Sequence, residues 1–220
     1  MKQPIKAVFF DFDDTLGDRE SYAYDCAKAI LKANTDIADP VAFEAVLQDW
    51  MLWDEKGNID KNHVAEMLQK KYQITVPYPD LNVYWDEQLW KYCVPYKDAR
   101  ETLTYLKEKY LLGVITNGPS FGQRKKIEIC GLSSFFAKEN ITVSGDGRYR
   151  KPDAEIFLEA CRKAGVQPQQ SVYVGDIYAN DVLGSQRAGM QSVWMWSAGN
   201  RKQSTSIPMI HALRELKDLL

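Results

Sequence analysis

The chain has 220 residues, of which 45% are hydrophobic and 26% are charged. This composition is ordinary for a folded protein, and the length allows one good core and a smaller second unit, so we expect no extended disorder. The 28 basic and 30 acidic residues leave a net charge of −2, which argues against binding to a nucleic acid polymer or an anionic membrane surface.

The first apolar run, residues 7–10, predicts a buried strand that stops at Asp11. This run is too short for a signal peptide, and no stretch reaches the roughly 18 apolar residues that a membrane span needs. The four cysteines are scattered and lack the spacing of a zinc site. We therefore expect a cytoplasmic protein with reduced cysteines and no membrane partner.

The segment that follows the first strand shows only helical patterns. These patterns cover residues 21–32, 40–53, 60–72 and 81–92. Gly17 permits a bend before them and Pro95 ends a helix after them. We predict a helical domain at residues 17–93, inserted into a core made of residues 1–16 and 94–220. Most of its many tryptophans and tyrosines should fill its small core.

After the insertion, strand and helix patterns alternate. Three strands and three helices are predicted, at residues 111–115, 172–174 and 193–195 and at residues 97–110, 153–164 and 180–188. Such alternation is typical of a parallel sheet with right-handed crossovers. The predicted fold is therefore α/β, a Rossmann-like parallel sheet with an inserted, mostly helical domain.

Acidic residues stand directly after the first strand. The sequence from Asp11 to Thr15, Asp-Phe-Asp-Asp-Thr, lies at the carboxyl end of that strand, where open α/β sheets bind ligands. An aspartate can attack phosphorus to form an aspartyl-phosphate, and a second carboxylate two residues on, Asp13, can act as acid and base. The alternative is that these residues only turn the chain and cap a helix, and the motif alone does not decide.

Polar residues also follow the second strand and precede a later helix. Thr116, Asn117 and Gly118 offer a hydroxyl, an amide and a backbone turn to a phosphoryl group, although Asn-Gly is also a common turn. Lys151, before Pro152, supplies a positive charge that can hold a carboxylate ionised and offset charge on the phosphoryl group. An exposed surface lysine is the alternative for this position.

The longest basic run comprises Arg124, Lys125 and Lys126, in the helix expected after Thr116. Such runs are typical of the solvated face of a helix. Arg124 could reach a phosphate from this helix, but we interpret the whole run as solvated.

A second acidic pair follows the strand at residues 172–174. Asp176 comes after Gly175, and Asp181 stands about one helical turn further on. Mg²⁺ prefers oxygen ligands and usually takes one or two carboxylates together with a substrate phosphate. We predict direct ligation by Asp11 and Asp176 and a third ligand in the main-chain carbonyl of Asp13. Asp181 would bind through water or fix Lys151. A helix cap could account for one of the two acids of this pair, but not easily for both.

In chain order, these segments resemble the four motifs of the haloacid dehalogenase superfamily, and four matches in the right order are far more specific than one. The resemblance covers residues 1–16 and 94–220 and implies a Rossmann-like sheet, Mg²⁺ and an aspartyl-phosphate intermediate. It implies the following roles: Asp11 as nucleophile, Asp13 as acid and base, Thr116 and Lys151 as phosphoryl ligands, Thr15, Asn117 and Gly118 as substrate contacts, and Asp11, Asp13, Asp176 and Asp181 around the metal. The insertion resembles the helical cap of the subgroup whose cap follows the first strand, without a motif that matches residue by residue.

The resemblance implies a Mg²⁺-dependent phosphatase of a small phosphorylated metabolite, of the nucleotide or sugar phosphate type. Asp13 argues against a dehalogenase, because the founding dehalogenases lack an aspartate there and the displacement of halide needs no proton donor. A sugar phosphomutase is the main alternative, followed by a non-catalytic binding protein and a 2-haloacid dehalogenase. The sequence leaves open the physiological ester and whether the protein is a monomer or a homodimer.

Overall fold

The computed structural model describes residues 4–196 and 206–220. Two compact units make up the chain: one runs to Asp18 and resumes at Pro95, and the other is Arg19–Val94. The boundaries predicted from the sequence, at residues 17 and 93, lie within two residues of these limits. No helix among the described residues is long and apolar enough to cross a membrane.

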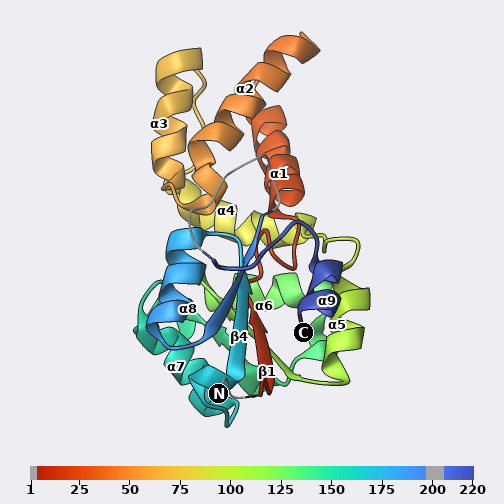
Figure 1. Ribbon diagram of the computed structural model, residues 1–220. Helices are drawn as coiled ribbons and strands as arrows, with labels where there is room; N and C mark the ends of the chain where they lie inside the picture. Colours follow the sequence, from red (N-terminus) through yellow and green to blue (C-terminus); the bar gives the residue numbers. More distant parts are fainter. Residues whose placement is uncertain (1–3, 197–205) are drawn as a thin grey trace. The chain divides into compact units, whose positions relative to one another are not determined.

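The first unit is built on a six-stranded, all-parallel sheet with the order β3-β2-β1-β4-β5-β6. The strands are β1 (Ala7–Phe10), β2 (Leu111–Thr116), β3 (Ile141–Val143), β4 (Ser171–Gly175), β5 (Gln191–Met195) and β6 (Met209–Ile210). The strand β1 lies between β2 and β4, with Ala7 opposite both Leu111 and Ser171. Figure 1 shows β1 beside β4. The predicted parallel α/β sheet is confirmed. The sequence missed β3 and β6, which are too short to show a strand pattern.

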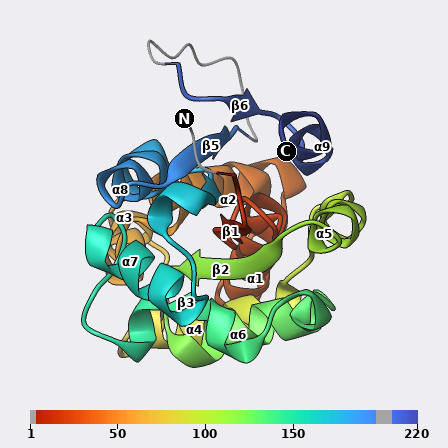
Figure 2. The ribbon, with the colours of Figure 1, turned by 60° about the horizontal axis from the view of Figure 1, so that its bottom comes forward.

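Helices cover both faces of this sheet. They are α5 (Ala99–Lys107), α6 (Ser120–Ile129), α7 (Ala154–Lys163), α8 (Leu183–Arg187) and α9 (Leu216–Leu219). In Figure 2, α7 and α8 lie on one side of the sheet, and α5 and α9 lie on the other. The apolar stripe of α7, which includes Ile156 and Phe157, packs with Phe9 and Tyr173 of the sheet. The helix predicted at residues 180–188 begins instead with a π-helical turn, Tyr178–Val182, a form that is frequent at functional sites.

The second unit consists of α1 (Arg19–Asn34), α2 (Pro40–Asp54), α3 (Lys61–Tyr72) and α4 (Leu81–Leu89), joined by short turns. The side chains of Asp39, Asp60 and Asp80 accept hydrogen bonds from backbone N–H groups at the starts of α2, α3 and α4, as helix caps do. Trp50 and Trp85 are buried and stack with their ring centroids 5.9 Å apart. Tyr22 is buried too, and the remaining tryptophans and tyrosines of this unit are half-buried: Tyr24, Trp53, Tyr72, Tyr78, Tyr84, Trp90 and Tyr92.

A buried ionic group also lies within this helical unit. Asp54 is 1% exposed and lies 2.7 Å from Arg19 Nη1 and 2.6 Å from Lys61 Nζ. Both basic residues are buried as well. Burial alone would raise the pKa of Asp54, but the two cations outweigh burial and hold it below its ordinary value.

Candidate active site

Acidic residues from two neighbouring strands and the segment after them converge at one edge of the sheet. Asp11 follows β1, Asp176 follows β4, and Asp181 lies in the π-helical turn after β4. All three are buried, and one carboxylate oxygen from each lies within 4.8 Å of the others. Since parallel strands end at the same edge, the strand order alone explains why residues so far apart in sequence meet here.

A tight turn fixes the segment after Asp11. The carbonyl oxygen of Phe12 accepts hydrogen bonds from the N–H groups of Leu16 at 2.9 Å and Gly17 at 2.8 Å. Asp14 adopts a left-handed conformation with φ 56°, which aspartate tolerates better than most residues. The hydroxyl of Thr15 is buried by this turn and has no hydrogen-bond partner among the described residues. A buried hydroxyl without a hydrogen-bond partner is uncommon in folded proteins.

Lys151 is the buried cation of the site. Its Nζ lies 2.7 Å from Asp11 Oδ1 and 2.7 Å from Asp181 Oδ1, and it donates a third hydrogen bond of 3.0 Å to the Tyr173 hydroxyl. The Tyr173 hydroxyl in turn lies 2.8 Å from the carbonyl oxygen of Ile115. An ammonium group has three protons, so these partners use all of them. The alternative of an exposed surface lysine does not apply.

The charges of this cluster do not balance. The pKa of Asp11 is raised to about 7, by burial first, against the opposing effect of Lys151, and also by the charge of Asp181. Burial opposes the charge on Lys151 too, but Asp11 and Asp181 outweigh burial and raise the pKa of Lys151. Burial also raises the pKa of Tyr173, so its hydroxyl stays protonated. Asp176 brings a third carboxylate close to Asp11 and Asp181, and an added cation would relieve the repulsion among the three.

The donor set fits a hard divalent cation. Carboxylate oxygens are the ligands that Mg²⁺ takes, and no nitrogen or sulfur ligand belongs to this cluster. Asp181, however, already uses both oxygens: Oδ1 faces Lys151 and Oδ2 accepts from Ile177 N at 2.8 Å. Of the two roles predicted for Asp181, the structure shows the contact with Lys151. Asp11 and Asp176 are therefore the carboxylates that could bind a metal directly.

The residue before Asp176 must be glycine for a steric reason. A Cβ atom at Gly175 would lie 2.4 Å from Asp181 Cγ, far closer than van der Waals contact allows. The main-chain carbonyl of Asp176 is held by Trp194, whose Nε1 donates a hydrogen bond of 2.8 Å. The Gly-Asp pair of the sequence thus allows the later Asp181 side chain to fold back beneath the strand end.

The segment after β2 supports the site from within the protein. The Asn117 side chain accepts from Lys151 N at 2.9 Å and donates to Lys151 O at 3.0 Å. The N–H of Gly118 donates to Ser144 Oγ at 3.1 Å. Asn117 and Gly118, expected to contact substrate, are therefore engaged within the chain, and Asn117 fixes the backbone of Lys151. Thr116 is buried at the end of β2.

Asp13 has partners that the sequence did not indicate. Lys126 Nζ lies 2.8 Å from both of its carboxylate oxygens, and Gln123 Nε2 donates to Oδ2 at 3.0 Å. The interpretation of Lys126 as a solvated residue is wrong: it is 4% exposed. Arg124, on another face of α6, forms an ion pair of 2.5 Å with the partly exposed Asp146. The three-residue spacing of Gln123 and Lys126 would have placed both on one helical face, but not against Asp13.

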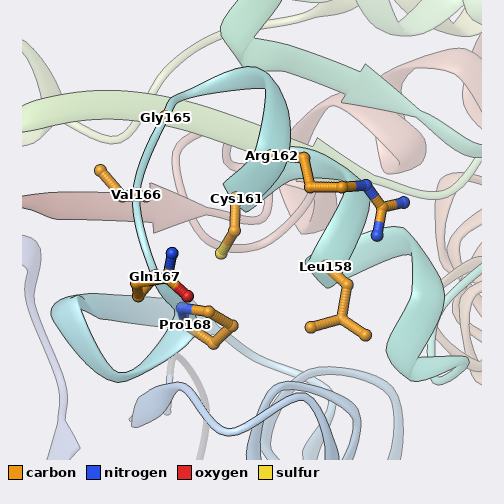
Figure 3. A pocket seen from close by; sticks show the side chains of 7 residues that line it. All are labelled: Leu158, Cys161, Arg162, Gly165, Val166, Gln167 and Pro168. Atoms are coloured by element: carbon orange, nitrogen blue, oxygen red, sulfur yellow. The ribbon is translucent and has the colours of Figure 1, made fainter.

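A surface cavity of about 380 Å³ lies elsewhere on the first unit (Figure 3). Leu158, Cys161 and Arg162 of α7 line it, together with residues 165–168. These last residues precede β4, so the cavity belongs to the end of that strand opposite Asp176. None of the predicted site residues contributes to it.

Known proteins resemble this chain over nearly its whole length. Residues 5–189 match the family model of haloacid dehalogenase-like hydrolases. Glyceraldehyde 3-phosphate phosphatase of Methanothermobacter thermautotrophicus is 30% identical, covering 98% of this chain and 100% of that protein. N-acylneuraminate-9-phosphatase of Mus musculus is 28% identical, covering 94% and 88%.

A solved structure shows the same fold. A hydrolase of this family from Bacillus subtilis, bound to magnesium, superposes with a TM-score of 0.74 at 21% identity and covers 99% of both chains. At that level of identity the likeness concerns the fold alone. The family match and the named relatives together confirm the prediction of a hydrolase of the phosphatase type. The chain belongs to the haloacid dehalogenase-like hydrolases.

Proposed function

We propose that this protein is a Mg²⁺-dependent phosphatase that hydrolyses a small phosphate monoester, of the nucleotide or sugar phosphate type, through an aspartyl-phosphate on Asp11. The observation that carries the proposal is the buried group of Asp11, Asp176 and Asp181 around Lys151. The two relatives named above act, by their names, on phosphate esters of sugars. This favours the sugar phosphate type over the nucleotide type.

In this proposal the metal is bound by Asp11, Asp176 and the main-chain carbonyl of Asp13. When bound, Mg²⁺ would neutralise negative charge on the phosphoryl oxygens. Lys151 holds Asp11 through Oδ1, which fixes the orientation of the carboxylate and favours its ionised form. Asp181 and Asn117 act on Lys151, one at its ammonium group and the other at its backbone.

The reaction then has two steps on the chain's own groups. In the first, a bond forms between an Asp11 oxygen and phosphorus, the bond from phosphorus to the alcohol oxygen breaks, and a proton moves from Asp13 to that oxygen. In the second, a water oxygen bonds to phosphorus, the bond to Asp11 breaks, and the water proton passes to Asp13. Thr116 and Thr15 would hold the phosphoryl oxygens, and Lys151, whose three protons go to Asp11, Asp181 and Tyr173, would offset their negative charge.

We assign substrate choice to the helical unit Arg19–Val94, as the cap of the enzyme. This unit carries eight half-buried aromatic residues, which offer ring surface to a sugar or a base. A small phosphorylated metabolite is the partner that such a site would take, and the assembly would be a monomer or a homodimer.

A panel of phosphate esters tests the proposal. We expect release of inorganic phosphate that requires Mg²⁺, with higher kcat/KM for sugar phosphates than for nucleoside monophosphates. Conversion of a sugar phosphate to an isomer without phosphate release would instead identify a phosphomutase. Release that persists after removal of divalent ions by a chelator would refute the metal requirement.

A further inference from the structure

Two buried polar side chains of α6, in the first unit, contact Asp13. Gln123 and Lys126 lie three residues apart on α6, so they share a face of that helix. Lys126 contacts both carboxylate oxygens of Asp13, and Gln123 contacts one of them. Both side chains are buried, at 4% and 3% exposure, whereas the Asp13 side chain is 19% exposed. Asp13 is thus held by two side chains of α6 and remains partly exposed.

At these buried positions, Lys126 and Gln123 lower the free energy of unfolding relative to apolar side chains. A buried ammonium group loses hydration worth several kcal/mol, which its ion pair with Asp13 has to offset. The Gln123 Oε1 atom is buried and lacks a hydrogen-bond partner among the described residues, which is itself unfavourable. An apolar pair would pack against the same helix face at lower cost. We therefore interpret the polar side chains at positions 123 and 126 as serving their contact with Asp13.

The same pair connects Asp13 to the rest of the site. Gln123 Nε2 also donates to the carbonyl oxygen of Asn117 at 3.0 Å, and Asn117 holds the backbone of Lys151. A Cβ atom at Gly118 would lie 2.6 Å from Gln123 Nε2, so this close approach requires glycine there, at φ 141°. A continuous set of hydrogen bonds therefore runs from Asp13 through α6 to the lysine beside Asp11.

We propose that Lys126, with Gln123, is a positioning residue for proton transfer by Asp13. This rests on the proposed function, in which Asp13 gives a proton to the departing alcohol. Lys126 and Gln123 fix the carboxylate so that it faces the alcohol oxygen, and the ammonium group stabilises the negative charge that appears on Asp13 as the proton leaves. No motif of the four includes either residue.

Two esters separate this role from a purely structural one. An alkyl phosphate needs a proton on its leaving oxygen, whereas p-nitrophenyl phosphate releases a stable phenolate without one. For Lys126→Met we expect kcat/KM to fall by about 10- to 100-fold with the best alkyl ester of the panel, and by less than about three-fold with p-nitrophenyl phosphate. Both values come from one preparation, so any unfolded fraction cancels in their ratio.

Matched variants complete the test. Lys125→Met removes the neighbouring lysine of α6, which pairs with Glu128 at the surface, and should change neither value. Gln123→Met should show the same split as Lys126→Met, but smaller. A uniform loss with both esters in Lys126→Met would overturn the inference.

Asp13→Asn, measured alongside, separates this inference from the proposed function. If Asp13→Asn shows the split and Lys126→Met does not, the inference fails and the function of Asp13 stands. If neither variant shows it, Asp13 is not the proton donor and both proposals fail.

Discussion

Two buried aspartates, one in each unit, show opposite balances of charge. Asp54 in the helical unit faces two cations, Arg19 and Lys61, and its pKa is held below the ordinary value. Asp11 in the sheet unit shares one cation, Lys151, with a second carboxylate, and burial raises its pKa to about 7.

The difference separates structure from function. A buried carboxylate with enough positive charge around it contributes to folding, and removing it leaves its cations without a partner. A buried carboxylate without enough positive charge is unfavourable in the protein alone, and it becomes favourable when a cation arrives. We therefore read Asp54 as structural and Asp11 as part of a metal site. Four measurements test this difference between Asp54 and Asp11.

The largest effect should be on activity. Asp11→Asn removes the nucleophile while keeping its shape, and we expect kcat/KM for phosphate release to fall by roughly 10⁴-fold. Steady-state assays with saturating Mg²⁺ measure this, with circular dichroism as the control for folding. Activity within ten-fold of the parent would rule out covalent catalysis at this residue.

The second effect is on stability, and its sign differs between the two aspartates. Asp54→Asn should lower the free energy of unfolding by about 3–5 kcal/mol, because Arg19 and Lys61 then lose a buried partner. Asp11→Asn, without divalent ions, should cost nothing and should add on the order of 1 kcal/mol, because it removes one of the two carboxylates that share Lys151 and leaves Asp181 as its partner. Urea denaturation followed by circular dichroism and tryptophan fluorescence compares them. Equal losses in both variants would contradict the contrast.

The third effect is the response to metal. Mg²⁺ at about 100 times its dissociation constant should raise the free energy of unfolding by about 2.7 kcal/mol. Asp176→Asn should abolish most of this gain, whereas Asp54→Asn should retain it. Thermal unfolding across a Mg²⁺ titration provides the measurement, and a full gain in Asp176→Asn would remove that residue from the metal site.

The smallest effect is on pH dependence without divalent ions. Because folding raises the pKa of Asp11 from 3.8 to about 7, the folded state binds more protons in this range, and stability falls as pH rises from about 4 to about 7. The slope should not exceed about 1.4 kcal/mol per pH unit. The pKa of Asp54 is lowered, so its contribution is present above pH 4 and is lost as the solution becomes more acidic. Saturating Mg²⁺ should remove the fall in stability between pH 4 and pH 7 and leave the loss of stability below pH 4. If Mg²⁺ does not change the fall between pH 4 and pH 7, that fall belongs to groups other than Asp11.

The fold and the acidic residues of the site could be predicted from the sequence, because both depend on local patterns. The apolar run before Asp11 and the one before Gly175 each predict a strand, and a parallel sheet brings their ends together. Lys151 could be predicted because it belongs to a motif. Strands as short as Ile141–Val143 give no pattern of their own, and they form because a neighbouring strand pairs with them.

The partners of buried charges could not be predicted in the same way. Lys126 and Asp13 are 113 positions apart, and nothing local distinguishes Lys126 from the half-buried Lys125 beside it. Tyr173 sits within an apolar strand, where an aromatic residue fits as core, and only the folded structure brings its hydroxyl to Lys151. Pairings of this kind depend on tertiary packing, which periodicity does not encode.

The covalent intermediate on Asp11 can be tested directly. Asp13→Asn should form the aspartyl-phosphate from p-nitrophenyl phosphate and Mg²⁺, since this ester needs no proton donor, and should hydrolyse it slowly for want of a base. After an acid quench, borohydride converts an aspartyl-phosphate to homoserine, which mass spectrometry of the digest locates. We predict homoserine at position 11. A burst of one p-nitrophenol per enzyme molecule, with Asp11 unmodified or another residue reduced, would contradict the central claim.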